Sequence, residues 1–420
     1  MKLHQRTLKN RLRIQAVELP GTNVVTTLIL AGAGSRYETK DISGISHFLE
    51  HMFFKGAKKY ATPASVAEAV DAFGGSFNAF TGKEYAGYYI KSGKSNFSKS
   101  LDVLSDMLIH SKFDTPEIDR ERGVILEEMA MYQDMPVYQI SWDFEQLVFG
   151  DQPLGRDQIG TKELIQTVTQ AQFKEYMQSL YVGENMVVTV AGAVNEDSLD
   201  LVEQYFAEVS GHKATRKPFP FEDIATEKIM LRTKKTEQYH LSYGAIAPSE
   251  KDKNYPALKI LSTILGGNMS SRMFQNVREK KGYCYSIRTS VDEYTDTGLI
   301  STNAGVRKED VLKALEAIRA EYDAVREQGV TPAEFAKAQN YLLGKIELST
   351  EDSESIAHHF AKEMLLYNST EDFEDWENQL KAVTIEQVNA LAADIFQPQN
   401  LRLAGIGQAL EREAVEKFVQ

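Results

Sequence analysis

Apolar and polar residues alternate along this chain in patterns that predict both strands and helices. Short runs rich in β-branched and aromatic residues predict strands at 12–17 and 24–36. The aromatic-rich run SFNAFTGKEYAGYYIKS predicts a hairpin at 76–92. The first half of the chain is therefore expected to contain a sheet with at least one hairpin.

Longer segments show the three- and four-residue apolar spacing of helices. One begins after DISG, where Asp41 or Ser43 is the expected N-cap, and another begins at Thr62-Pro63. Two more are expected at 96–110 and 116–132. Strands and helices together predict an α+β fold.

The second half of the chain repeats features of the first. Thr169, Asn185 and Gly192 return as Thr384, Asn400 and Gly407, at a constant offset. The Thr-Pro pair at 115–116 also returns, at 331–332. Two matches at nearly one offset predict a duplicated domain. The alternative is that any two α+β halves share such patterns.

We therefore expect two homologous domains, each with a mostly antiparallel sheet packed with helices. Residues 1–212 would form the first domain and residues 225–420 the second. The polar, proline-containing segment 213–224 would be the linker between them. The length of 420 residues also favours two domains over one.

Composition excludes several classes of partner. The net charge of −13 argues against a nucleic-acid partner, because such binders usually carry a basic patch. Cys284 is the only cysteine, which rules out an internal disulfide and a Cys-rich zinc site. We find no apolar leader and no run of 18 apolar residues, so we expect no membrane partner and a cytoplasmic location.

The stretch HFLEHMFFKG at 47–56 has the spacing of a metal site. On a helix, His47 and His51 lie on one face, one turn apart, with Glu50 beside them. Two imidazoles and a nearby carboxylate suit a zinc ion and the water it activates. The alternative is an exposed Glu-His face on an ordinary helix. It fits the apolar neighbours Phe48 and Leu49 poorly, because they predict burial.

A third protein ligand is expected on the helical segment DRERGVILEEMAMY at 119–132. Glu121 and Glu128 lie seven residues apart, hence on one face, and Glu128 is the candidate ligand. The second half has no His-x-x-Glu-His motif, and Gly344 takes the place of Glu128 there. A shared scaffold therefore does not explain these residues.

The order His-x-x-Glu-His marks the inverted zincins. With GGSFNAFTGKEYAGYY and ERGVILEE, the chain resembles the pitrilysin family of zinc peptidases, in particular the branch of mitochondrial processing peptidase and its bacterial homologues. The segment LGGNMSSRMFQNVREKKGYCYSI at 265–287 is similar to a motif in the C-terminal half of that family. The resemblance covers essentially the whole chain and implies the processing-peptidase fold, half of a clamshell.

The resemblance also implies roles for individual residues. His47, His51 and Glu128 would bind one zinc ion per chain, Glu50 would be the general base, and Glu121 would support the site. Arg278 and Tyr285 would bind the substrate and stabilise the transition state. An extended peptide would add to the sheet edge formed by Asn78, Ala79, Phe80 and Thr81, and Phe54 would line a side-chain pocket.

These roles predict a zinc endopeptidase that hydrolyses short or unfolded peptides, working as a homodimer. Tyr138 and Trp142 stand where we align the acids with which processing peptidases hold a basic residue, so a presequence-type arginine preference is not expected. One alternative is a non-catalytic peptide-binding or scaffold subunit of the same fold. Another is a metallohydrolase that acts on a small molecule.

Overall fold

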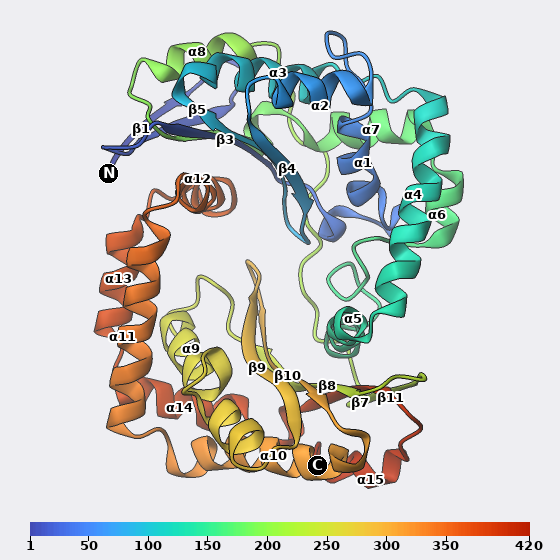
Figure 1. The fold of residues 1–420 in the computed structure, drawn as a ribbon, viewed down its shortest axis with the longest axis vertical. Helices are drawn as coiled ribbons and strands as arrows, with labels where there is room; N and C mark the ends of the chain where they lie inside the picture. The colour runs from blue at the N-terminus through green and yellow to red at the C-terminus, as the bar shows by residue number, and fades with distance from the viewer. The chain divides into compact units, whose positions relative to one another are not determined.

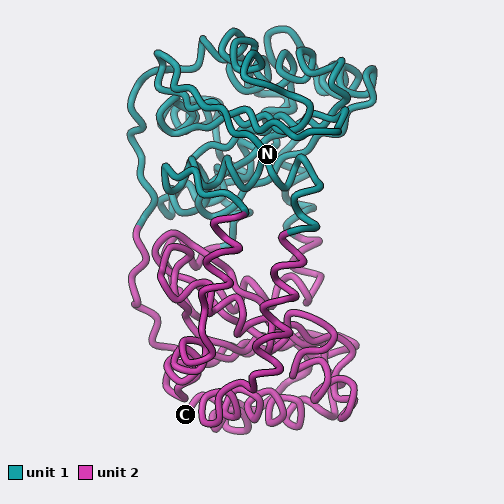
Figure 2. The backbone as a smooth tube through the Cα atoms, turned by 90° about the vertical axis from the view of Figure 1, so that its left-hand side faces the viewer, with its two compact units in different colours: residues 1–129, 157–219, 347–373 teal, residues 130–156, 220–346, 374–420 magenta.

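The computed structural model describes all 420 residues, which form two compact units. Figure 2 shows unit 1, made of residues 1–129, 157–219 and 347–373, and unit 2, made of residues 130–156, 220–346 and 374–420. Each unit thus combines segments that are distant in the sequence. None of the helices has both the length and the apolar character that crossing a membrane requires.

The sheet of unit 1 has six strands in the order β1-β2-β6-β3-β5-β4. Their bounds are β1 Lys2–Thr7, β2 Arg13–Glu18, β3 Val24–Ala31, β4 Ser76–Thr81, β5 Ala86–Gly93 and β6 Met186–Gly192. β2 and β6 are parallel, and the other neighbours are antiparallel. The expected strands and hairpin are confirmed, and β4 of the hairpin is an edge strand.

Helices cover both faces of this sheet. The helices of unit 1 are α1 Ile45–Phe53, α2 Pro63–Asp71, α3 Phe97–Ile109, α4 Thr115–Asp134, α6 Lys162–Thr167, α7 Gln170–Leu180, α8 Ser198–Phe206 and α12 Ser353–Lys362, of which α6 and α7 pack on α1. α3 packs on β5 and β3, and α8 packs on β2. α12 crosses β3 and β6 on the opposite face (Figure 1). The sheet therefore lies between two helical layers.

The sheet of unit 2 repeats this topology. Its order is β7-β11-β8-β10-β9, with bounds β7 Ile229–Thr233, β8 Tyr239–Ala247, β9 Cys284–Glu293, β10 Gly298–Val306 and β11 Arg402–Gly407. As in the series β2-β6-β3-β5-β4, the first two strands are parallel and the others antiparallel. The mostly antiparallel sheets expected for two related halves are confirmed.

One helix from each half of the sequence packs in the other unit. The helices of unit 2 are α5 Pro136–Phe149, α9 Tyr255–Ser262, α10 Val311–Gln328, α11 Pro332–Ser349, α13 Phe373–Ala382, α14 Ile385–Ile395 and α15 Arg412–Glu416. α5, from the first half, buries Ile140 and Phe144 against Ala404 and Ile406 of β11. α12, from the second half, covers the unit 1 sheet. The exchange is reciprocal.

Two of the three residue pairs that recur at a constant offset have equivalent structural roles. Thr169 and Thr384 each begin a helix with a capping box. The amides of Asn185 and Asn400 each donate to the carbonyl five residues earlier, on Leu180 and Ile395 respectively. These roles explain why the two halves share these residues. The linker at 213–224 contains no helix or strand; its role as the boundary between homologous halves stays a prediction.

Candidate metal centre

The helix α1 is buried through its apolar side chains, as the sequence predicts. Phe48, Leu49 and Met52 are fully buried. Phe48 packs edge-on against Phe173 of α7, with ring centroids 5.0 Å apart. Packing of these apolar side chains therefore holds α1 in place, and this fixes the positions of its polar residues.

The start of α1 corrects the expected N-cap. Neither Asp41 nor Ser43 caps the helix; its first residue follows Gly44, which has φ of 105°. The buried carboxylate of Glu38 instead accepts hydrogen bonds from the backbone N–H groups of Gly44, at 2.7 Å, and Ser46, at 2.8 Å. The prediction was wrong because a carboxylate outside the DISG turn reaches the free N–H groups first.

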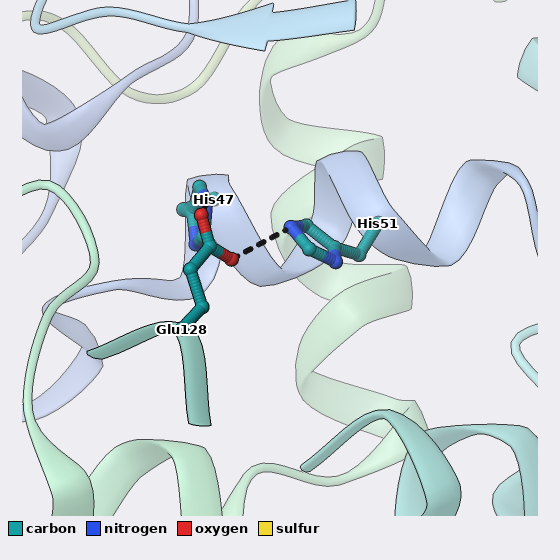
Figure 3. Close-up of side chains that lie close together, drawn as sticks. All are labelled: His47, His51 and Glu128. Atoms are coloured by element: carbon teal, nitrogen blue, oxygen red, sulfur yellow. Dashed lines mark ion pairs between the residues drawn. The ribbon is translucent and has the colours of Figure 1, made fainter. Parts of the chain in front are cut away.

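The side chains of His47, His51 and Glu128 converge. The three candidate ligand atoms lie within 4.8 Å of one another. One Glu128 oxygen is 3.8 Å from His47 Nε2, and the other is 3.5 Å from His51 Nε2. Figure 3 shows the carboxylate directed toward the imidazole rings. The structure brings together the three residues that the sequence singled out.

This donor set fits a zinc ion. Ligands about 2.0–2.1 Å from a tetrahedral zinc lie about 3.4 Å from one another, close to the separations from Glu128 to the two imidazoles. Burial, together with the neighbouring His51, lowers the pKa of His47 to about 3. His47 is therefore neutral at physiological pH, the form that binds a metal. Three protein donors leave a fourth position for water or substrate.

A carboxylate and a lysine support His51 from behind. His51 Nδ1 lies 2.9 Å from Glu121 Oε1, and Lys55 Nζ lies 2.6 Å from the other Glu121 oxygen. Burial alone would raise the pKa of Glu121, but the hydrogen bonds from His51 and Lys55 lower it. An ionised Glu121 only accepts hydrogen bonds, so Nδ1 of His51 carries the proton and Nε2 presents its lone pair toward Glu128.

The carboxylate of Glu50 is held by the edge strand. Thr81 Oγ1 of β4 donates a hydrogen bond of 2.5 Å to Glu50 Oε2. Burial raises the pKa of Glu50, and the nearby Glu128 adds to this, while the Thr81 hydrogen bond and His51 oppose it. Glu50 therefore has a raised proton affinity, lies close to the candidate ligands and is oriented by the strand expected to bind substrate.

Helix α4 is anchored so that Glu128 reaches the site. Ile125 and Met129 are buried, and Leu126 is half-buried. Arg122 donates to the backbone carbonyls of Ile165, at 2.5 Å, and Val168, at 2.6 Å. The helix is thereby tied to α6 and the turn that follows it.

The expected substrate residues occupy the edge strand and its surroundings. Asn78, Ala79, Phe80 and Thr81 lie in β4, whose outer edge has no neighbouring strand in the sheet. Phe54 packs against Phe77 of the same strand, with ring centroids 5.7 Å apart. An available strand edge is the feature that β-augmentation requires.

Arg278 and Tyr285 contact each other in unit 2. The Arg278 guanidinium lies 5.7 Å from the Tyr285 ring centroid and 4.4 Å from that of Phe274. Tyr285 is 76% exposed at the start of β9. An exposed tyrosine beside a cation suits contact with a ligand. Their part in catalysis stays a prediction.

Three residues around the site, Lys55, Glu38 and Arg122, were not predicted from the sequence. Lys55 follows His51 by four residues, and this spacing was a usable signal for a contact near the same acid. Glu38 and Arg122 act through backbone groups, which no residue pattern identifies. These three residues position the candidate ligands without belonging to the motif.

Family models match both halves of the chain. Residues 13–162 match the family described as Insulinase (Peptidase family M16), and residues 167–342 match the Peptidase M16 inactive domain. The first match contains His47, Glu50, His51 and Glu128. The second contains Arg278 and Tyr285.

Curated proteins and solved structures agree with these matches. The uncharacterized zinc protease YmxG of Bacillus subtilis (strain 168) is 35% identical and covers 93% of this chain and 95% of its own. An uncharacterized zinc protease of Streptomyces coelicolor is 33% identical, covering 97% of this chain and 90% of its own. A crystal structure of a protease from Helicobacter pylori superposes with a TM-score of 0.91 at 24% identity, over 97% of this chain and 99% of that one.

Proposed function

Because this chain belongs to the M16 family of peptidases, together with relatives named zinc proteases, we propose that it is a zinc endopeptidase for short or unfolded peptides. The convergence of His47, His51 and Glu128 beside Glu50 is the observation that carries the proposal. The three ligands would hold one zinc ion. When bound, zinc supplies Lewis-acid chemistry, lowering the pKa of water and polarising a carbonyl.

Glu50 acts as the general base. Its carboxylate takes a proton from the attacking water as the new bond forms between the water oxygen and the carbonyl carbon. It then delivers this proton to the leaving nitrogen as the carbon–nitrogen bond breaks. The hydrogen bond from Thr81 fixes one carboxylate oxygen and leaves the other for this transfer.

Glu121 and Lys55 position His51. The contact from Nδ1 to Glu121 fixes the tautomer and orientation of the ring. Lys55 holds the Glu121 carboxylate in its ionised form. Both residues act through His51 and touch no substrate.

The substrate binds as an extended strand along β4. Main-chain hydrogen bonds to residues 78–81 would hold it, so affinity depends little on its side chains. Tyr285 and Arg278 are natural donors to a developing oxyanion. They belong to the second half of the fold, and in the homodimer that the family resemblance implies, one chain's Arg-Tyr pair would complete its partner's site.

A cleavage assay on a mixed peptide library tests the proposal against a peptide-binding scaffold. Purified protein is assayed as isolated, after chelation, and after zinc is restored. We expect cleavage that chelation abolishes and zinc restores. A protein that holds zinc and binds peptides without cutting any of them would be a receptor, and the proposal would be wrong.

A further inference from the structure

A cavity of about 330 Å³ lies beside the edge strand of unit 1, between the sheet and α12. Its walls are Leu28, Phe80, Tyr89, Glu354, Ser355 and His358. Three of these residues come from β3, β4 and β5, and the other three lie along one side of α12. None of them belongs to the candidate metal centre.

The cavity is on the face of the sheet opposite to α1. Side chains alternate between faces along a strand, so Phe80 points away from the face of its neighbours Ala79 and Thr81. Thr81 contacts Glu50 of α1, whereas the Phe80 ring lies 5.7 Å from the ring of His358 in α12. β4 thus has a metal-centre face and an α12 face.

The backbone of β5 makes room for Phe80. Gly87 pairs with Phe80, and a Cβ atom on Gly87 would come within 2.2 Å of the Phe80 ring. The ring therefore lies over the glycine and forms one wall of the cavity. Leu28 pairs with Tyr89 and supplies the apolar floor.

A peptide strand added to β4 has the same alternation. Every second side chain would point toward the metal-centre face, and the side chains between them would point toward the α12 face. Neighbouring strands lie about 4.8 Å apart, so a long side chain on the α12 face reaches the cavity over Phe80.

The cavity walls combine aromatic rings with one carboxylate. Phe80, Tyr89 and His358 present rings, and the Glu354 carboxylate interacts with the hydroxyl of Tyr89. That partner is uncharged. Glu354 lies in the first turn of α12, whose N-terminus offsets part of its charge. A purely apolar guest would still remove the carboxylate from water without supplying a cation, which is unfavourable. A long basic side chain satisfies both features: its aliphatic stem packs on the rings and its cation pairs with Glu354.

We propose that this cavity is a specificity pocket for a lysine or arginine side chain of the peptide substrate. The inference rests on the proposed peptidase function and on strand addition at β4. It assigns the basic preference to α12, a different element from the one that bears Tyr138 and Trp142. Glu354 is thus a specificity-determining residue rather than a catalytic one.

Matched peptides and variants of the full chain test this proposal. Cleavage sites are first mapped on a neutral peptide set. At each subsite, lysine is then compared with norleucine, and arginine with citrulline, which keep the shape and remove the charge. We expect a preference of about tenfold for the charged residue, near the lower end of the range for a charge-assisted hydrogen bond. The preference should occur only at every second subsite, where the side chain points toward the α12 face.

The variants are Glu354→Gln and, as a control with the same change in charge, Glu351→Gln. Glu351 is exposed just before α12 and does not line the cavity. Glu354→Gln should lose the preference for the charged residue, and a thermal unfolding midpoint equal to that of wild type shows that it folds. Glu354→Lys should prefer glutamate over lysine at the same subsites.

Four outcomes would overturn the inference. Wild type that cuts neutral peptides without a basic preference, or a preference that Glu354→Gln and Glu351→Gln affect equally, defeats the pocket assignment while the proposed function stands. A preference for apolar residues at these subsites that is unchanged in Glu354→Lys would contradict the assignment of the pocket to lysine or arginine side chains. Wild type that cuts no peptide at all defeats both proposals.

Discussion

Lys55 Nζ lies 2.6 Å from Glu121 Oε2, and this ion pair is the outermost link of a chain that leads to the candidate metal ligands. The other Glu121 oxygen contacts His51 Nδ1. Glu121 is nearly fully buried, with a side chain 4% exposed. A buried carboxylate with two donors has little freedom, so the pair fixes the orientation of His51.

Replacing Lys55 should therefore weaken zinc binding. We expect Lys55→Met to reduce zinc affinity by about tenfold, the lower end of the range for residues behind a metal ligand. Competition with a chromophoric chelator measures the affinity. Lys55→Arg keeps the charge and should recover most of it. Lys58→Met, in an exposed position nearby, is the control, and an equal loss in both methionine variants would contradict the role of Lys55.

Mixing two inactive chains tests the shared site. Arg278→Ala removes the guanidinium that is proposed to bind the substrate, and Glu50→Gln removes the proposed general base. A mixed dimer would hold one site with both groups intact, so activity should return to roughly half of the wild-type value per dimer. Differently tagged chains allow mixed dimers to be isolated. Absence of rescue in isolated mixed dimers would contradict sharing, and a monomer by sedimentation would contradict the dimer.

An ion pair in unit 2 should make the stability of that unit depend on pH. Arg272 contacts both oxygens of Glu334, at 2.7 and 2.8 Å. Burial would raise the pKa of Glu334, but Arg272 and Thr331 lower it to about 2. Since the folded pKa lies below the ordinary value of 4.5, the stabilisation is present above pH 4.5 and is lost as the pH falls toward 2.

Glu334→Gln should thus lower the free energy of unfolding by about 1–3 kcal/mol at pH 7, and by less near pH 3, where part of the stabilisation is already lost. Trp142 and Trp376 are the only tryptophans and both belong to unit 2, so urea unfolding followed by their fluorescence reports this unit. Glu309→Gln, at an exposed position, is the control. An equal effect of Glu334→Gln at both pH values would contradict the assignment.

Local patterns in the sequence predicted most of the elements and the three candidate ligands. The spacing of His47 and His51 sets their side of α1, and the apolar residues between them bury the helix, so this part needed no knowledge of the fold. Glu128 was predictable because the second half has glycine at the equivalent position. These signals are local or come from comparing the two halves.

The rest depends on contacts between distant segments. An amphipathic helix pattern does not specify which sheet it covers, so the exchange of α5 and α12 between the units was not predicted. Glu38 caps α1 from before the expected turn, and Arg122 donates to carbonyls more than 40 positions away. The pocket beside β4 was missed for the same reason, because its walls come from both ends of the chain.

The central claim is that His47, His51 and Glu128 bind zinc while Glu50 carries out the proton transfer. Zinc content and peptide cleavage, measured together on wild type, Glu50→Gln and Glu128→Gln, test it most directly, with exposed Glu127→Gln as the control. We predict one zinc per chain and cleavage in wild type and the control, zinc without cleavage in Glu50→Gln, and neither in Glu128→Gln. Glu50→Gln that cuts peptides at the wild-type rate, or Glu128→Gln that keeps its zinc, would contradict the account.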